Sequence, residues 1–253
     1  MEKMTIDERY KYLRTMQKRY RKSDRSQSGV LLGKIRRYGI SNLPEEGIET
    51  FFRNGNITSL MLRFNSVERG ARQKLLPLCR AHNVGGIAYS VTGRGMLTGK
   101  LPQQPEFEAG DTRNLDPLFQ CQRYQSGLRL AAKLAEIGDR YGKTPAQTAI
   151  AWVLSHDGVT CALTGPATIA HLEENIDASG WELSVDDLQE LEVHFQQEEE
   201  RLLKVQQASL ERILPNPLQQ DPLEAFMDIM NVIEIALCLN LVSSEEIFSL
   251  YLE

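Results

Sequence analysis

The sequence predicts an α/β fold in which parallel strands alternate with helices. Four short apolar segments are each followed by a segment of helical character. One of them, residues 85–100, ends in a loop rich in glycine and threonine, which is typical of a buried parallel strand that delivers a ligand loop at its C-terminal end. Repeated strand–helix units of this kind pack as a parallel sheet covered by helices.

The first three units lie between residues 34 and 90. The predicted strands are IRRYGIS (35–41), ITSLMLRF (57–64) and NVGGIAYS (83–90). Pro44 opens the first helix (44–55), because proline suits the first turn of a helix. A leucine-rich helix over 73–82 precedes the third strand.

The remaining elements are mostly helical. We expect a helix over 127–141 that stops at Gly142, and a helix that Thr144 and Pro145 begin. VTCALTG (159–165) is the fourth strand, and the helix 169–178 follows it. A long helix starts near Ser184 and continues past the acidic run 198–200, and two further helices are predicted after residue 221.

Composition favours a soluble, cytoplasmic protein. The formal charge of −5 argues against a general nucleic-acid or membrane-surface binder, and no apolar run reaches membrane-spanning length. The chain starts without the apolar core of a signal peptide. Cysteines occur singly, without metal-ligand spacing, so reduced thiols and no metal site are expected; they are Cys79, Cys121, Cys161 and Cys238.

Residues 1–33 differ from the rest of the chain. They predict a basic amphipathic helix that ends near Ser23, and a solvated leader is favoured over an arm that binds nucleic acid. The stretch also resembles the leader of some bacterial integrase or transposase proteins, without the helix-turn-helix that should follow. It therefore suggests a fused gene start.

Residues 85–100, GGIAYSVTGRGMLTGK, are the first candidate for a ligand site. Glycines let backbone amides approach a ligand closely, and Arg94 and Lys100 offer positive charge to a phosphate. An ordinary strand followed by a surface loop would have the same local composition. The neighbouring segments favour the ligand loop.

Six motifs, taken together and in this order, resemble the C-terminal half of the aldo-keto reductases, especially the bacterial and potassium-channel β-subunit-like branch. The resemblance runs from about residue 34 to residue 192, and the motifs are YGISN (38–42), RFNSVERG (63–70), LLPLCRAHNVGGIAYS (75–90), GRGMLTGK (93–100), GKTPAQTAIAWVL (142–154) and TGPATIAHLEENIDA (164–178). It implies about four units of a (β/α)8 barrel and a nicotinamide cofactor, NADPH or NADH, that exchanges hydride with a carbonyl carbon. It also divides the chain into a leader (1–33), a half-barrel (34–195) and a helical extension (196–253).

The resemblance assigns cofactor-binding roles to fifteen residues. One pair binds the nicotinamide carboxamide and one aromatic side chain stacks on the nicotinamide ring. A loop and a nearby cation surround the pyrophosphate, a second basic residue helps to cover the cofactor, and a last group lies around the adenosine. In that order they are Ser41 and Asn42; Tyr89; Ser90, Val91, Thr92, Gly93, Arg94, Gly95, Lys100 and Arg113; and Gly165, Thr168, Glu174 and Asn175.

Three positions depart from the family pattern. Met61 stands where a glutamine usually contacts the carboxamide, and Ala167 stands where a cation usually meets the 2′-phosphate of NADPH. His171 replaces a glutamine or arginine and could supply a weaker contact. These departures predict weakened binding and leave the preference between NADP and NAD open.

The catalytic tetrad of the family (Asp, Tyr, Lys and His) lies in the half of the barrel that the resemblance does not cover. Residues 1–33 offer no such set at strand ends, so no catalytic residue is assigned. The first hypothesis is a truncated, catalytically impaired oxidoreductase. The alternatives are a non-catalytic nucleotide-binding or regulatory protein and a rearranged gene remnant. A half-barrel also leaves two sheet edges open, which predicts an oligomer or helices that cover them.

Overall fold

A computed structural model describes residues 35–43, 45–54, 57–213 and 229. The predicted leader helix, Pro44, the helices expected after residue 221 and Cys238 lie outside the described residues. The predicted division into a leader, a half-barrel and an extension stays a prediction.

Four parallel strands form one sheet in the order β1-β2-β3-β4. They are β1 (Gly39–Ser41), β2 (Ser59–Arg63), β3 (Gly85–Tyr89) and β4 (Val159–Ala162). The predicted α/β class and the four strands are confirmed, although each strand is shorter than the apolar segment that predicted it. The register shifts between Gly86 and Ile87, where β3 pairs with β4.

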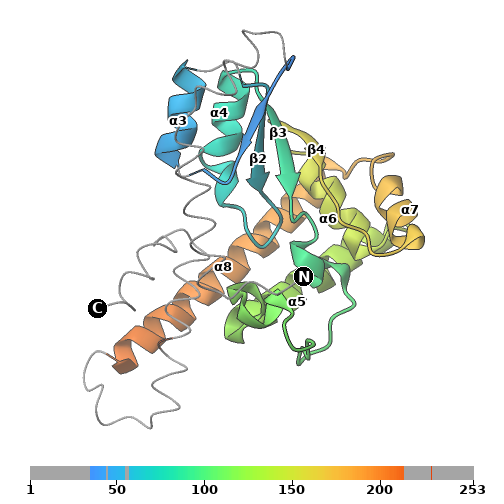
Figure 1. The fold of residues 1–253 in the computed structure, drawn as a ribbon. Coiled ribbons are helices and arrows are strands. Elements are labelled where there is room, and N and C mark those ends of the chain that lie inside the picture. The colour runs from blue at the N-terminus through green and yellow to red at the C-terminus, as the bar shows by residue number, and fades with distance from the viewer. Residues whose placement is uncertain (1–34, 44, 55–56, 214–228, 230–253) are drawn as a thin grey trace.

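Helices connect the strands in the expected order (Figure 1). α3 (Glu45–Asn54) and α4 (Leu75–Ala81) lie side by side along one side of the sheet. α6 (Pro145–Leu154) begins in a capping box, in which Thr144 Oγ1 accepts from the Gln147 amide and Gln147 Oε1 accepts from the Thr144 amide. α7 (Ile169–Asp177) follows β4, and α8 (Val185–Ile213) is a long helix that crosses the predicted boundary at residue 195. Short 3-10 turns complete the connections: η1 (Gly70–Arg72), η2 (Gly93–Thr98), η3 (Thr112–Leu115) and η4 (Pro117–Phe119).

The predicted start of the helix 127–141 was wrong. α5 runs from Cys121 to Asp139, so Gly127 lies inside the helix and not at its beginning. A Cβ atom at Gly127 would lie 2.7 Å from the sulfur of Met96, which is fully buried. Glycine is therefore required there for close packing of α5 against η2, because a side chain would overlap with Met96.

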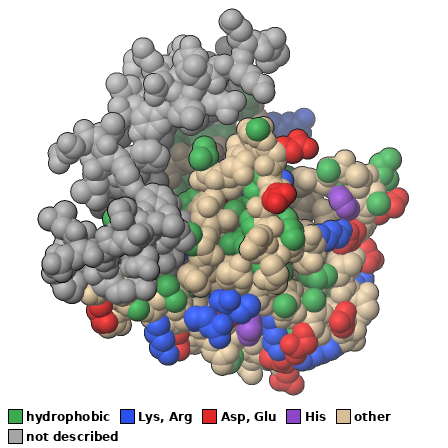
Figure 2. All heavy atoms as spheres, turned by 90° about the horizontal axis from the view of Figure 1, so that it is seen from below, with side chains coloured by type: hydrophobic (Ala, Val, Ile, Leu, Met, Phe, Trp, Pro, Cys, Tyr) green, Lys and Arg blue, Asp and Glu red, His purple; other side chains and the backbone are tan. Residues whose placement is uncertain are grey.

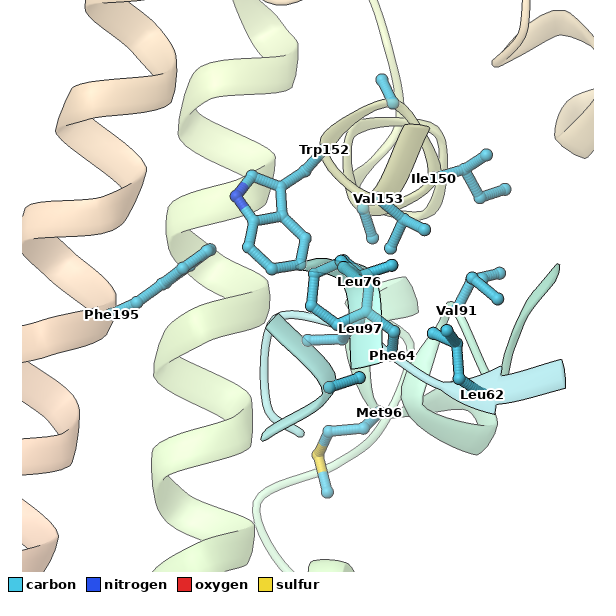
Figure 3. Close-up of a cluster of buried hydrophobic side chains, with 14 of the residues drawn as sticks. Leu62, Phe64, Leu76, Val91, Met96, Leu97, Ile150, Trp152, Val153 and Phe195 are labelled. Atoms are coloured by element: carbon cyan, nitrogen blue, oxygen red, sulfur yellow. The ribbon is translucent and has the colours of Figure 1, made fainter. Parts of the chain in front are cut away.

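The core joins the sheet to the helices through three large aromatic side chains (Figure 3). Trp152 from α6 lies between Phe64, which follows β2, and Phe195 from α8, with ring centroids 5.2 and 5.4 Å apart. All three are at most 1% exposed. α8 is thus packed onto the same core as the strands, which fixes the sheet relative to the helical layer.

The described surface mixes charges of both signs. Seen from below, lysine and arginine side chains alternate with aspartate and glutamate (Figure 2). Between α5 and α8, for example, Lys133 pairs with Glu190 and Arg140 pairs with Asp187. No helix among the described residues is long and apolar enough to cross a membrane.

Candidate functional site

A groove of about 670 Å³ lies at the C-terminal ends of β3 and β4, bounded by the loops that follow them and by α7. In parallel α/β proteins ligands bind at this end of the strands, and a groove of this volume suits an organic cofactor. Eleven of the fifteen predicted residues line it: Tyr89, Ser90, Val91, Thr92, Arg94, Gly95, Lys100, Arg113, Gly165, Glu174 and Asn175.

The other four predicted residues do not line the groove. Ser41 ends β1, and Asn42 follows it and accepts a hydrogen bond from the Tyr89 hydroxyl at 3.3 Å. Gly93 is buried inside its loop. Thr168 uses its hydroxyl to cap α7, accepting from the His171 amide at 3.2 Å. Asn42 is therefore tied to the groove through Tyr89, whereas Thr168 positions α7.

The loop after β3 has an unusual backbone conformation. Residues Ser90, Gly93, Arg94 and Gly95 all have positive φ, between 56° and 97°. Two of these are glycines, which adopt such angles without steric cost. For Ser90 and Arg94 the conformation is strained, so contacts elsewhere must hold it.

Asn65 supplies the first of these contacts. It is fully buried, and its Nδ2 donates to the Ser90 carbonyl at 3.0 Å and to Glu68 Oε2 at 2.9 Å. Its Oδ1 accepts from the Val67 and Glu68 amides at 2.9 and 2.8 Å. One side chain thus fastens the loop after β2 to the loop after β3.

Ion pairs to Arg94 supply the second. Its guanidinium pairs with Glu68 (3.0 Å) and Asp116 (2.5 Å) and donates to Ser90 Oγ at 3.1 Å. Burial opposes ionisation of Glu68, but Arg94 and Arg63 outweigh it and hold its pKa below the ordinary value. Arg94 is only 24% exposed and engages two carboxylates, so it stabilises the loop.

Lys100 and Arg113, the other two predicted cations of the groove, each pair with one carboxylate. Lys100 is 60% exposed, and its Nζ lies 3.7 Å from Glu174. Arg113 pairs with Asp111 and stacks over the Phe107 ring, 4.2 Å from its centroid. Exposed ion pairs contribute little to stability, so Lys100 can exchange its carboxylate for a bound anion. Arg113 is held more firmly, because it makes three side-chain hydrogen bonds to Asp111, of 2.6 to 3.1 Å.

Three residues of this region were not predicted from the sequence. Arg63 ends β2, lines the groove, and places its guanidinium 5.9 Å from the Tyr89 ring centroid while pairing with Glu68. Asn65 and Glu68 were part of a quoted motif but received no role. Their spacing of three residues is typical of a turn. Their contacts with Ser90 and Arg94 could not be predicted from the sequence, because they form only when β2 and β3 lie side by side.

The two departures near α7 lie at the groove as predicted. Ala167 and His171 both line it, and His171 is exposed. Glu174 accepts from Thr144 Oγ1 at 2.6 Å, which ties α7 to the start of α6. Among the described residues no group of three or more histidine, cysteine or acidic side chains could hold a metal ion.

Comparison with known proteins identifies the family. The model of the aldo/keto reductase family matches residues 6–195. The chain belongs to the aldo/keto reductase family. The match begins at residue 6 and so includes most of the predicted leader (1–33). The resemblance predicted from the motifs is thus confirmed, and the sheet with its helices corresponds to part of the barrel of these proteins.

The relatives are about twice as long as the matched segment. The aldo-keto reductase YhdN of Bacillus subtilis is 32% identical over 160 residues, which cover 63% of this chain and 48% of the relative. A glycerol dehydrogenase from Gluconobacter oxydans is 28% identical with a TM-score of 0.62, over 78% of this chain and 54% of the dehydrogenase. An aldo/keto reductase from Klebsiella pneumoniae, solved with NADP and acetate, is 26% identical with a TM-score of 0.50, over 67% and 52%. The chain therefore spans about half the length of the proteins it matches.

Proposed function

We propose that the groove binds a nicotinamide dinucleotide, as the cofactor-binding half of an aldo-keto reductase-like oxidoreductase. The observation that carries the proposal is the convergence of loops from β3, β4 and α7 on one groove that offers cations, hydroxyls and an aromatic ring. Cations and hydroxyls suit phosphates, and a flat ring suits a flat ring. The Klebsiella relative with NADP bound supports the same cofactor class.

We propose a place in the groove for each part of the cofactor. Tyr89 would support the nicotinamide ring, and its hydrogen bond to Asn42 orients that amide toward the carboxamide. Lys100 and Arg113 would bind the pyrophosphate. Glu174 and Asn175 would face the adenine. When bound, the cofactor supplies the hydride that passes to or from a carbonyl carbon.

We further propose that the chain discriminates weakly between NADPH and NADH. Ala167 offers no charge to a 2′-phosphate, and the exposed His171 stands where the family pattern has glutamine or arginine. Met61 removes one polar contact to the carboxamide, which weakens the binding of both forms.

Fluorescence titration tests this proposal. NADPH and NADH should bind with dissociation constants within about tenfold of each other. We expect their binding free energies to differ by at most about 1.4 kcal/mol, because Ala167 cannot form an ion pair with the 2′-phosphate. Tyr89→Ala should weaken both about tenfold, because aromatic stacking contributes about 0.5–1.5 kcal/mol beyond area burial. Lys100→Ala should weaken binding, whereas Lys143→Ala, which removes a lysine paired with Asp177 outside the groove, should not. Unchanged affinity in Tyr89→Ala and Lys100→Ala would refute the site.

We propose that the chain by itself does not reduce a carbonyl group, because the motifs that resemble the family assign cofactor residues and no Asp, Tyr, Lys and His set. A generic aldehyde with NADPH should therefore show binding without turnover. This outcome would also fit a non-catalytic nucleotide-binding protein, our second candidate. Turnover would show that residues we have not assigned complete the site.

The open edge of the sheet favours a homo-oligomer. Among the described strands β4 pairs only with β3, and Thr160 and Cys161 on it are exposed. Beside it, α7 exposes Ile169 (75%) and Ile176 (62%). Two copies would together have the eight strands of a (β/α)8 barrel. Light scattering should show a dimer that Ile176→Asp dissociates, and a stable monomer of the unchanged chain would contradict the proposal. The thiols of Cys79 and Cys161 are free and suit the reducing cytoplasm that we propose for the protein.

A further inference from the structure

A second polar site lies away from the groove, between α5, α8 and the segment that follows β2. It is a cavity of about 10 Å³, room for a single water-sized sphere. Four buried donor atoms from three residues at this cavity have no hydrogen-bond partner: Arg123 Nε and Nη2, Arg69 Nη1 and Ser66 Oγ. Unpartnered buried polar atoms are rare in folded proteins, so four around one cavity indicate that something binds there.

Arg123 is the centre of this site. It is the third residue of α5 and only 5% exposed, and Ser66 is 2% exposed. A guanidinium cannot lose its proton in a protein, so Arg123 carries its charge into the interior. An isolated buried charge is strongly destabilising unless an opposite charge lies beside it.

The carboxylates that line the cavity are already engaged. Glu198, 4% exposed, pairs with Arg129 at 2.7 Å and accepts from Ser126 Oγ at 3.1 Å. Burial opposes ionisation of Glu198, but hydrogen bonds from Arg129 help to hold its pKa below the ordinary value. Glu199 pairs with Arg69 Nη2. Within the described part of the chain, Arg123 has no carboxylate within 4.0 Å, and the two carboxylates of Glu198 and Glu199 already face three other arginines, Arg69, Arg129 and Arg201.

We propose that the cavity is a binding site for a monatomic anion, with chloride as its ordinary occupant. A chloride in this cavity would accept hydrogen bonds from donors that line it and would neutralise Arg123 at the same time. A water molecule would satisfy some of the donors but would leave the charge. The cavity volume excludes sulfate, phosphate and carboxylate ligands, which need several times the space of one sphere.

The anion would connect three parts of the fold. Arg123 lies on α5, Arg69 precedes η1, and Ser66 is next to Asn65, whose side chain holds the loop of the candidate cofactor groove. Chloride therefore acts as a structural ion that fastens the segment after β2 to the helical layer. The site does not depend on the proposed cofactor, since no residue that lines the cavity lines the groove.

Thermal unfolding of the full chain tests the proposal. At constant ionic strength, chloride replaces gluconate or sulfate as the added anion. A ligand that binds only the folded state at one hundred times its dissociation constant raises Tm by about 5 to 10 °C for a chain of this size. We expect a saturable rise of this order with chloride and bromide, and none with sulfate.

Two variants separate the site from a general salt effect. Arg123→Met keeps much of the volume and removes the charge, so its Tm should not depend on chloride and should equal or exceed that of the unchanged chain in chloride-free buffer. Arg80→Met is the matched control: Arg80 is 60% exposed, 3.7 Å from Asp157, and remote from the cavity lining, so this variant should keep the full chloride response. If Arg123→Met does not fold, chloride-35 line broadening on the unchanged chain, reversed by bromide, replaces it as the test.

Each outcome decides the matter. A halide-specific rise that Arg123→Met abolishes and Arg80→Met preserves supports the site, as does broadening that bromide reverses. The absence of any halide-specific shift in the unchanged chain, or a shift that survives in Arg123→Met, overturns it.

Discussion

Replacing Asn65 with alanine should lower both the stability of the fold and the order of the loop after β3. The substitution removes four hydrogen bonds of 2.8 to 3.0 Å from a fully buried position. It takes the Oδ1 acceptor from the Val67 and Glu68 amides and one donor from the Ser90 carbonyl, which still accepts from the Gly93 amide at 2.7 Å. Each buried group left unsatisfied costs about 1–3 kcal/mol, and water entering the space of the lost amide recovers part of this. We therefore expect a loss of about 3 kcal/mol in the free energy of unfolding.

Urea denaturation and a thermal melt measure this loss. About 3 kcal/mol corresponds to a Tm lower by about 6 to 12 °C for a chain of this length. Asn114→Ala is the control, since Asn114 is exposed and donates one side-chain hydrogen bond, to the Glu108 carbonyl at 3.0 Å; its loss should stay below about 1 kcal/mol. Asn65→Ala should also weaken NADPH binding by more than Asn114→Ala does. Equal, small losses in the two variants would refute the view that Asn65 holds the loop.

Three further predictions concern other parts of the structure. Gly86→Ala should destabilise the fold by at least about 1–3 kcal/mol, because its Cβ would lie 2.3 Å from the Gly158 carbonyl oxygen, whereas Gly180→Ala, with open space around it, should stay within about 0.5 kcal/mol in urea denaturation. Thiol labelling at pH 8, mapped by mass spectrometry, should modify the exposed Cys161 and spare Cys79, since burial raises the pKa of Cys79 to about 11; equal labelling rates would contradict this. Because the pKa of Glu68 is lower folded than unfolded, its stabilisation is present above the unfolded value of about 4.5 and is lost as the pH falls through the folded value. Stability should therefore fall more steeply on acidification below about pH 4.5 in the unchanged chain than in Glu68→Gln; parallel slopes would contradict it.

The sequence predicts the order and type of the elements well because each depends on local signals. Apolar runs predicted all four strands, and Thr144 with Pro145 predicted the start of α6, which the structure confirms. Strand ends were predicted less well, since pairing partners determine them: only Gly39–Ser41 of the segment 35–41 pairs with β2. Gly127 was predicted to start a helix but lies inside α5, where its packing against Met96 outweighs the low helix propensity of glycine.

The candidate site was predicted residue by residue from the family resemblance, while the interactions within it were not. Arg94 was expected to face a phosphate, and the structure shows it engaged by Glu68 and Asp116, which lie 26 and 22 residues away in the chain. No local pattern indicates such pairs, because they exist only once β2 and β3 lie side by side. The same holds for Arg123, whose burial depends on α8.

These pairings change what the groove can contribute to affinity. Its four cations, Arg63, Arg94, Lys100 and Arg113, each already pair with a carboxylate, and four carboxylates are involved: Glu68, Asp111, Asp116 and Glu174. The described groove is therefore nearly neutral, and long-range attraction of an anionic cofactor is weak. A phosphate must displace a carboxylate, which is easy at the exposed Lys100 and difficult at Arg94, which two carboxylates hold. We therefore expect stacking on Tyr89 and the amides of the loop to supply most of the binding free energy, so that affinity for the dinucleotide depends little on salt.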